Sequence, residues 1–196
     1  PQFLDRNLAA GVDVFAIQRN LSTISSYQER RYGFALRMGY EFNEYMRQSW
    51  TYSLSQRNIY DVLNTASLYV QEQAGSTVLS QVSTTLAYDR RDSRIDPQRG
   101  YLVRFSGDLA GLGGDVAYVR GRVDAIGFIP LERVFGAREW QIVVMGSMGG
   151  LLPWGTVAQQ DRIVDRFFLG GDNLRGFAIG GAGPRDISTG DSLGGR

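Results

Sequence analysis

The chain has 196 residues, a formal net charge of +1, and neither cysteine nor histidine. It therefore lacks disulfides, thiolate metal ligands, and the commonest general base and metal ligand in proteins. Without these residues we do not expect an enzyme, a cofactor or a metal. Because the net charge is close to zero, the chain also has no overall field to attract nucleic acid, and we do not expect a nucleic-acid-binding protein.

In chain order, seven segments alternate apolar residues with small or polar ones, which predicts β-strands. The clearest is 31–42, where even positions are large and apolar while odd positions are small or charged. One face of this strand is therefore apolar along its length. The predicted strands lie near 7–18, 31–42, 47–57, 80–90, 101–109, 116–128 and 139–149. A short helix is expected within 64–74.

The length of these strands favours a membrane protein. They exceed the usual 5–6 residues of globular sheets and match the roughly 9–11 residues of a tilted transmembrane strand. Short turns alternate with longer loops, as in outer-membrane barrels. Aromatic residues flank the short turns and are expected to form a membrane-interface girdle: Phe42, Tyr88, Tyr101, Phe128 and Trp140.

We predict an all-β antiparallel meander that forms part of a transmembrane β-barrel. Seven strands cannot close a bacterial barrel, which has an even number of strands, and hydrocarbon does not tolerate open sheet edges. Residues 1–149 are therefore expected to be a barrel segment, and residues 150–196 a long loop.

Three motifs resemble those of one family. The segment Leu174-Arg175-Gly176-Phe177, preceded by Gly170 and Gly171, resembles a signature of the outer-membrane insertase and translocase superfamily, which includes BamA and the two-partner secretion transporters. The run Gly183-Pro184-Arg185-Asp186 is similar to the segment that follows this signature in BamA proteins. A third set of residues resembles a periplasmic turn motif of the family: Asp89, Arg91, Asp92, Pro97 and Gly100.

The resemblance implies a barrel of roughly 16 strands, of which this chain would supply about seven. The POTRA domains and the remaining strands would lie outside it. The implied function is non-enzymatic insertion and assembly of nascent proteins in the cell outer membrane. The implied partners are membrane lipid, nascent outer-membrane proteins and the lipoproteins of an assembly complex. Alternatives are a two-partner secretion barrel and a passive porin; a soluble β-domain enzyme is disfavoured by the missing histidine and cysteine.

The resemblance also implies that the extracellular loop at 150–196 folds into the barrel lumen, where its arginine bonds wall carboxylates. We expect Arg175 to act as this latch, with Leu174 and Phe177 wedged against the wall. Its main partner is expected outside this chain, and the inward-facing candidates within it are Glu41, Asp108 and Asp124. The alternative is a tight glycine turn with an exposed arginine. Other inward arginines could line a selective pore or form wall ion pairs: Arg37, Arg47, Arg104, Arg120 and Arg122.

Overall fold

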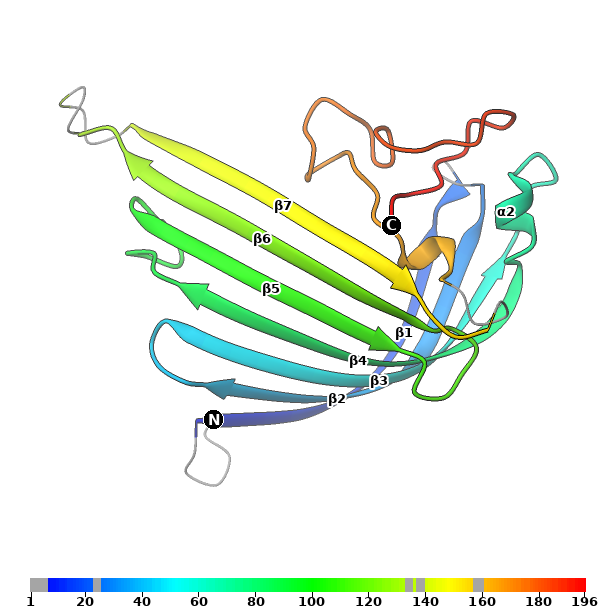
Figure 1. Cartoon of the computed structure of the whole chain (residues 1–196), viewed down its shortest axis with the longest axis horizontal. Helices are drawn as coiled ribbons and strands as arrows, with labels where there is room; N and C mark the ends of the chain where they lie inside the picture. The colour runs from blue at the N-terminus through cyan, green and yellow to red at the C-terminus, as the bar shows by residue number, and fades with distance from the viewer. Residues whose placement is uncertain (1–6, 23–25, 133–135, 137–139, 157–160) are drawn as a thin grey trace.

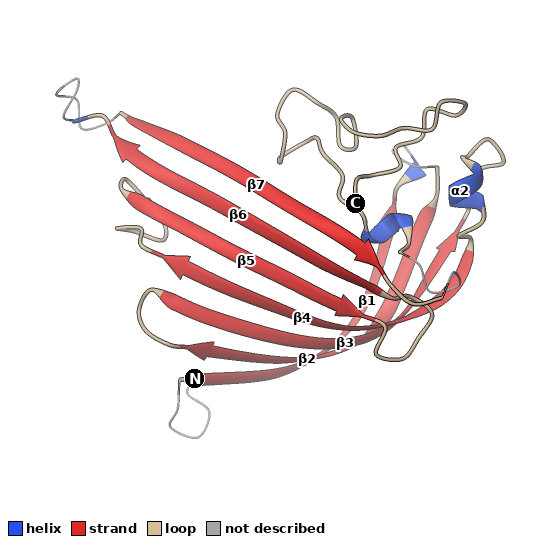
Figure 2. Cartoon of the chain, viewed as in Figure 1, coloured by secondary structure: helices blue, strands red, loops and turns tan. Residues whose placement is uncertain are grey.

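The computed structural model describes residues 7–22, 26–132, 136, 140–156 and 161–196. In this part of the chain, β-strands dominate (Figure 2). They form one antiparallel meander in the order β1-β2-β3-β4-β5-β6-β7, so the predicted fold class is confirmed. The strands are β1 Leu8–Asn20, β2 Gln28–Glu41, β3 Met46–Tyr60, β4 Gly75–Asp89, β5 Gly100–Ala110, β6 Tyr118–Pro130 and β7 Gln141–Pro153.

Several strands run further than the alternation indicated. β3 continues to Tyr60 and β4 begins at Gly75, because the ladder between them extends through Asn58 opposite Ser76 and Ile59 opposite Gly75. Polar residues occupy both faces over 55–58 and 76–77, which hides the period-two pattern there. β7 runs through Pro153, so four residues of the range predicted as loop belong to the sheet.

The strand register separates an apolar face from a polar one. Phe34 lies opposite Leu54 and Tyr52 opposite Val82, and the rings of Phe34 and Tyr52 meet edge to face at 6.4 Å. These side chains stay partly exposed, as do most others on this outer face. So many exposed large apolar side chains on one face of a sheet are unusual for a soluble monomer. The inner face carries ion pairs, such as Arg37 with Asp13 at 2.6 Å.

The prediction that Phe128 belongs to the aromatic girdle is wrong. This residue lies opposite Gly100 on β5 and Val143 on β7, which puts it on the inner face with Arg104 and Asp124. The physical reason is the pleat: Val119 and Val123 point outward, so residues at even positions of β6 point inward. Outer-face aromatic residues do cluster near the short turns, as in the Tyr88–Tyr101 pair, whose ring centroids are 6.1 Å apart.

The sheet curls into a trough, and the segment after β7 turns back over its concave side (Figure 1). Two small cores join this segment to the long-loop end of the sheet. One contains Tyr27, Ile59, Val70 and Ile163, and it unites the short helix α2 (Leu68–Gln71) with the 3-10 turn η2 (Ile163–Asp165). The second packs Phe167 against a buried cluster: Leu79, Ala110, Val116, Tyr118 and Leu151.

None of the helices in the described ranges is long and apolar enough to cross a membrane.

Candidate functional site

The C-terminal loop is bonded to the inner face of the sheet through Asp165. Its Oδ1 accepts hydrogen bonds from Arg57 Nη1 on β3 at 2.9 Å and from Tyr118 Oη on β6 at 3.2 Å. Arg120 Nη1, also on β6, donates to the Asp165 backbone carbonyl at 2.9 Å. One loop residue thus joins two strands that lie three places apart in the sheet.

These charges are almost fully buried. The side chain of Arg57 is 5% exposed and that of Asp165 is 2% exposed. Arg57 Nε also lies 3.3 Å from Glu29 Oε1 on β2. The Glu29 contact is electrostatic, because Arg57 Nε has no in-line hydrogen-bond acceptor in the described chain. Removing one partner of such a buried network leaves an uncompensated charge, which costs about 3–5 kcal/mol.

Local structure presents the Asp165 carboxylate toward the wall. The η2 turn closes through Asp165 N–H donating to the Arg162 carbonyl at 2.9 Å, while Asp165 Oδ2 accepts from Arg162 N at 3.3 Å. Ile163 is fully buried, and its N–H donates to Gln73 Oε1 at 2.8 Å. The turn is therefore fixed both by its own capping bonds and by the segment that precedes β4.

Two further attachments follow Asp165 in sequence. Arg166 forms an ion pair with Asp161 at 2.8 Å, and it donates to Tyr69 Oη at 2.5 Å while lying 4.4 Å from the Tyr69 ring. Phe167 fills a hollow left by Gly149 on β7, since a Cβ at Gly149 would lie 2.8 Å from the Phe167 ring. The loop is therefore held by both charge and shape.

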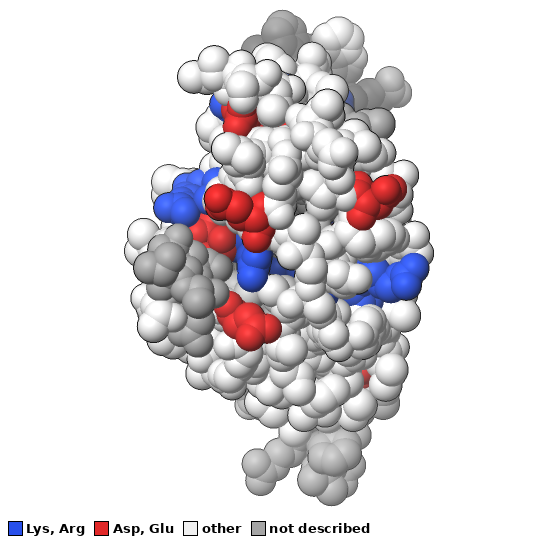
Figure 3. Space-filling model, turned by 90° about the vertical axis from the view of Figure 1, so that its right-hand side faces the viewer, with Lys and Arg blue, Asp and Glu red and all other residues white. Residues whose placement is uncertain are grey.

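Asp191 fastens the end of the loop to two other long loops. Its Oδ1 accepts from Ser26 Oγ at 2.8 Å, and its Oδ2 accepts from the Ser67 backbone N–H at 2.8 Å. Ser26 precedes β2 and Ser67 caps α2, so this one carboxylate ties three connections together. Acidic and basic side chains are interspersed across this end of the molecule, without a single-sign patch (Figure 3).

The predicted latch motif forms a tight hairpin. Gly170 has φ 131°, and a Cβ there would overlap the Ala178 carbonyl oxygen at 1.8 Å, so only glycine fits. Gly171 N–H donates to the Phe177 carbonyl at 2.8 Å, which places Leu174, Arg175 and Gly176 at the tip. Gly176 also has a positive φ, of 92°.

Arg175 lies exposed at this tip. With the residues that the structure describes it makes no hydrogen bond or ion pair, and Phe177 is 53% exposed. Leu174 borders a hollow of about 770 Å³ between the loop and the wall. The latch role of Arg175 therefore stays a prediction that depends on a partner beyond these residues.

The structure does not bring Arg175 to any of the three predicted carboxylates. Asp108 pairs with Arg120 at 2.7 Å, and Asp124 pairs with Arg122 at 2.7 Å. Glu41 lies at the short-turn end of the inner face, directly opposite Arg47.

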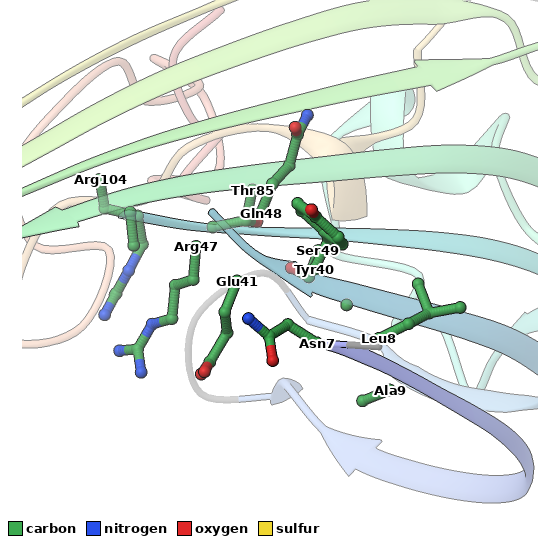
Figure 4. A pocket seen from close by; sticks show the side chains of 12 residues that line it. Asn7, Leu8, Ala9, Tyr40, Glu41, Arg47, Gln48, Ser49, Thr85 and Arg104 are labelled. Carbon is green, nitrogen blue, oxygen red and sulfur yellow. The ribbon is translucent and has the colours of Figure 1, made fainter. Parts of the chain in front are cut away.

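Arg47 and Arg104 extend to the same side of the sheet as Glu41, beside a hollow of about 420 Å³ (Figure 4). Neither arginine has a hydrogen bond or an ion pair with the described residues. The three other inner-face arginines of the predicted set are all in wall ion pairs: Arg37, Arg120 and Arg122. Ion pairing therefore accounts for part of the predicted set, whereas Arg47 and Arg104 lie opposite Glu41 and Asp124 in the strand register without a direct ion pair to a described residue.

The second predicted loop segment forms its own hairpin. Gly183 has φ 119° and precedes Pro184, whose carbonyl accepts from Leu193 N–H at 3.0 Å. Arg185 donates to the carbonyls of Gly180 and Gly190, at 3.1 and 2.8 Å. The Asp186 carboxylate accepts from the hydroxyl and the N–H of Ser188, and the hydroxyl bond is the main reason that the pKa of Asp186 is lowered.

The turn between β4 and β5 brings most of its predicted motif residues together. Asp89 forms a two-bond pair with Arg91, with both distances 2.8 Å. Asp92 Oδ1 accepts from the N–H groups of Ser93, Gln98 and Arg99, and the Arg99 bond contributes most to lowering the pKa of Asp92.

Gly100 closes this turn with φ 98°, where a Cβ would lie 2.1 Å from the Arg90 carbonyl oxygen. Pro97 lies in the loop between the bonds that Asp92 makes, and its ring fixes φ there. The side chains of Asp89 and Asp92 and the backbone of Gly100 are thus each required by the shape of the turn.

Sequence reasoning missed the central network of the site. Glu29 precedes the predicted start of its strand, and Tyr118 was not singled out. Asp165 is one of five aspartates in 161–191, and their spacing alone indicates no role for it. One signal was available, because Asp165 stands between the apolar pairs Ile163-Val164 and Phe167-Phe168, which is typical of a carboxylate carried into a buried place. In the described part of the chain, no cluster of acidic residues could hold a metal ion.

The comparisons with known proteins agree with this architecture. The model of the Omp85 superfamily domain matches residues 1–196.

This chain belongs to the Omp85 superfamily.

Omp85 relatives match at moderate identity. The outer membrane protein assembly factor BamA of Neorickettsia risticii is 34% identical over 194 residues, which cover 99% of this chain and 25% of that protein. A human sorting and assembly machinery component 50 homolog is 36% identical over 135 residues, covering 67% of this chain and 26% of that protein. The chain thus spans about a quarter of the length of these curated relatives.

A solved structure shows the same fold. The crystal structure of BamA from Haemophilus ducreyi lacking POTRA domains 1–3 matches with a TM-score of 0.83 and 20% identity, covering all of this chain and 41% of that one. The predicted family and the predicted partial barrel are therefore both confirmed. Omp85 proteins are a family of outer-membrane β-barrels.

Proposed function

We propose that this chain is part of an Omp85 barrel that inserts and assembles other proteins in an outer membrane. The similarity to BamA along 99% of the chain supports assembly over two-partner secretion or a passive pore. By analogy with BamA, the substrates are nascent outer-membrane proteins, and lipoproteins of an assembly complex are the partners. The process makes or breaks no covalent bond and uses no cofactor.

The observation that carries this proposal is the division of the sheet into two faces, with a loop bonded to the polar one. The apolar outer face suits membrane lipid, whereas the polar and charged side chains of the inner face suit a barrel interior that admits water and polar backbone. Asp165, Arg57 and Tyr118 hold the loop there. We infer that the described residues after β7, 154–156 and 161–196, belong to an extracellular loop folded into the barrel lumen, and that the turn containing Asp92 faces the periplasm.

In this proposal the loop has two kinds of attachment. Asp165 bonds to arginine of the wall, and the exposed Arg175 reaches carboxylates on parts of the barrel outside this chain. A guanidinium on the hairpin tip suits such a bond, because it can donate two parallel hydrogen bonds to one carboxylate.

The proposed function is tested with the full-length protein reconstituted into lipid vesicles. An unfolded outer-membrane β-barrel protein is added, and its folding is followed by its shift in mobility on a semi-native gel. Assembly activity predicts faster folding than in empty vesicles, with a slower rate for Arg175→Ala. A folding rate equal to that of empty vesicles would refute the assembly proposal. A separate ion-conductance measurement distinguishes a passive porin, which would show a large steady current.

A further inference from the structure

A cavity on the inner face of the sheet, beneath the C-terminal loop, has excess positive charge. Its volume is about 500 Å³, and Arg31 of β2 and Arg57 of β3 line it together with Thr51 and Ser53. Arg57 uses Nη1 for Asp165, as described above. Arg31 belongs to neither the predicted latch nor the Asp165 attachment.

The two arginines are direct cross-strand partners. Like charges placed opposite each other on one face of a sheet destabilise it. Arg57 is compensated by Asp165 and Glu29. Arg31 donates through Nε to Ser55 Oγ at 3.0 Å and lies 5.3 Å from the ring of Phe15. In the described chain, no carboxylate lies within ion-pair distance of its guanidinium.

The charges around the cavity therefore do not balance. One side of the lining contains three arginines, Arg19, Arg31 and Arg57, and only two carboxylates near them, Glu29 and Asp165. Glu29 pairs with both Arg57 and Arg19, whereas Asp165 pairs with Arg57 alone. The Arg120–Asp108 pair on the far side is neutral. Arg19 is 63% exposed, so solvent screens much of its charge, whereas Arg31 is half-buried and has no ion pair with the described residues, which is a costly place for a charge. The buried Arg57 Nε, which has no in-line acceptor among the described residues, lies in the same network.

We propose that this cavity binds a monoanion of carboxylate size between Arg31 and Arg57. The terminal nitrogens of Arg31 can donate two parallel hydrogen bonds to a carboxylate, and the hydroxyls of Thr51 and Ser53 supply further donors. The volume holds such an anion together with several waters. The carboxylate comes either from a small dissolved acid or from an acidic side chain of a polypeptide inside the barrel. The site is independent of the proposed assembly function and can exist without it.

The test is the thermal unfolding midpoint of the full-length protein in detergent, with sodium formate replacing sodium gluconate at constant ionic strength. Gluconate carries its carboxylate on a bulky polyol and serves as the reference salt. When formate exceeds its Kd about fivefold, we expect the midpoint to rise by roughly 1 °C, because the curated relatives are several times longer than this chain and a protein of that length has a correspondingly larger unfolding entropy. Arg31→Gln should abolish this rise. Arg47→Gln is the matched control, because Arg47 is an inner-face arginine of β3 outside the cavity, and it should keep the rise.

A second arm identifies the source of the carboxylate. A short polar peptide with one central glutamate is compared with the same peptide carrying glutamine. If the glutamate peptide reproduces the formate effect, a polypeptide side chain reaches the site; if only formate acts, the ligand is a small free anion. Both results support the proposal. Equal midpoints in formate and gluconate for the unmutated protein overturn it, and so does an undiminished formate response in Arg31→Gln. The first comparison needs no variant, so it decides the question even if Arg31→Gln does not fold.

Discussion

Arg57 and Asp165 are 108 residues apart in sequence, yet Arg57 Nη1 donates to Asp165 Oδ1 at 2.9 Å in a place that is almost closed to solvent. The polarity of this bond is the reverse of that expected for the latch motif, because the wall supplies the arginine and the loop supplies the carboxylate. The loop is therefore attached to this part of the sheet without any contribution from Arg175.

Asp165→Asn should weaken the attachment of the loop. The amide can still accept a bond from Tyr118, but it leaves the buried Arg57 with only Glu29 as a counter-charge. We expect a loss of about 2–4 kcal/mol in the free energy of unfolding, measured by urea titration of the full-length protein. Asp172→Asn, at an exposed acid of the same loop, is the control and should stay within about 0.5 kcal/mol of the parent. Equal effects of the two substitutions would contradict this assignment.

Gly149→Ala should displace Phe167 from the wall. The added Cβ would lie 2.8 Å from the Phe167 ring, and overpacking of this kind costs about 1–3 kcal/mol. Gly150→Ala is the matched control, because no heavy atom lies within 4 Å of its Cβ position. Limited proteolysis of the loop should become faster only for Gly149→Ala. Combining Gly149→Ala with Phe167→Leu should restore part of the protection, and failure to do so would argue against a direct clash.

Gly100→Ala should disturb the β4–β5 turn more than its backbone conformation alone explains. Gly100 has φ 98° and would place a Cβ 2.1 Å from the Arg90 carbonyl, whereas Gly75 has φ 108° with open space around it. Both alanine variants carry the strain of a positive φ, so their difference isolates the clash. We expect Gly100→Ala to lower the free energy of unfolding by at least about 1 kcal/mol more than Gly75→Ala does. Similar losses would show that the contact is relieved by small shifts.

The β4–β5 turn should lose order in acid through Asp92. Its pKa is lowered in the folded protein by backbone N–H donors, chiefly that of Arg99. For a carboxylate with a lowered folded pKa, the stabilisation is complete above the unfolded pKa and disappears as the pH falls through the folded one. Hydrogen exchange at the Gln98 and Arg99 amides, corrected for intrinsic rates, should therefore accelerate over that acidic range. Asp92→Asn should remove the pH dependence; if it persists, another group controls the turn.

The sequence was most informative where one face of a strand is apolar and the other is polar. The alternation in 31–42 predicts β2 because lipid-facing and interior side chains differ sharply there. Near Arg57 and Asn58 both faces are polar, so the pattern ends before the strand does. The error at Phe128 has a related origin: its aromatic character suggested a membrane girdle, whereas its position in the pleat directs it inward.

The candidate site was only partly predictable for a different reason. The turn around Asp92 is local, and its residue types report directly on the hydrogen bonds that they make. The bond between Arg57 and Asp165 depends on how the sheet curls beneath the loop, which neither segment encodes by itself. A single sequence shows that Asp165 has apolar neighbours, but it does not show which of the 21 arginines forms an ion pair with Asp165.

A double-mutant cycle between Arg57 and Asp165 tests most directly whether the loop is held to the wall by this pair. The free energy of unfolding is measured for the full-length parent, Arg57→Gln, Asp165→Asn and the double variant. We predict a coupling energy of at least about 1.5 kcal/mol, because each single substitution leaves the other buried charge of the pair without this partner, while the double substitution removes both charges. The loss of Arg57 beside Glu29 occurs in Arg57→Gln and in the double variant alike, so it cancels in the cycle. Additive effects, within about 0.5 kcal/mol, would contradict the account and mean that the loop is held elsewhere.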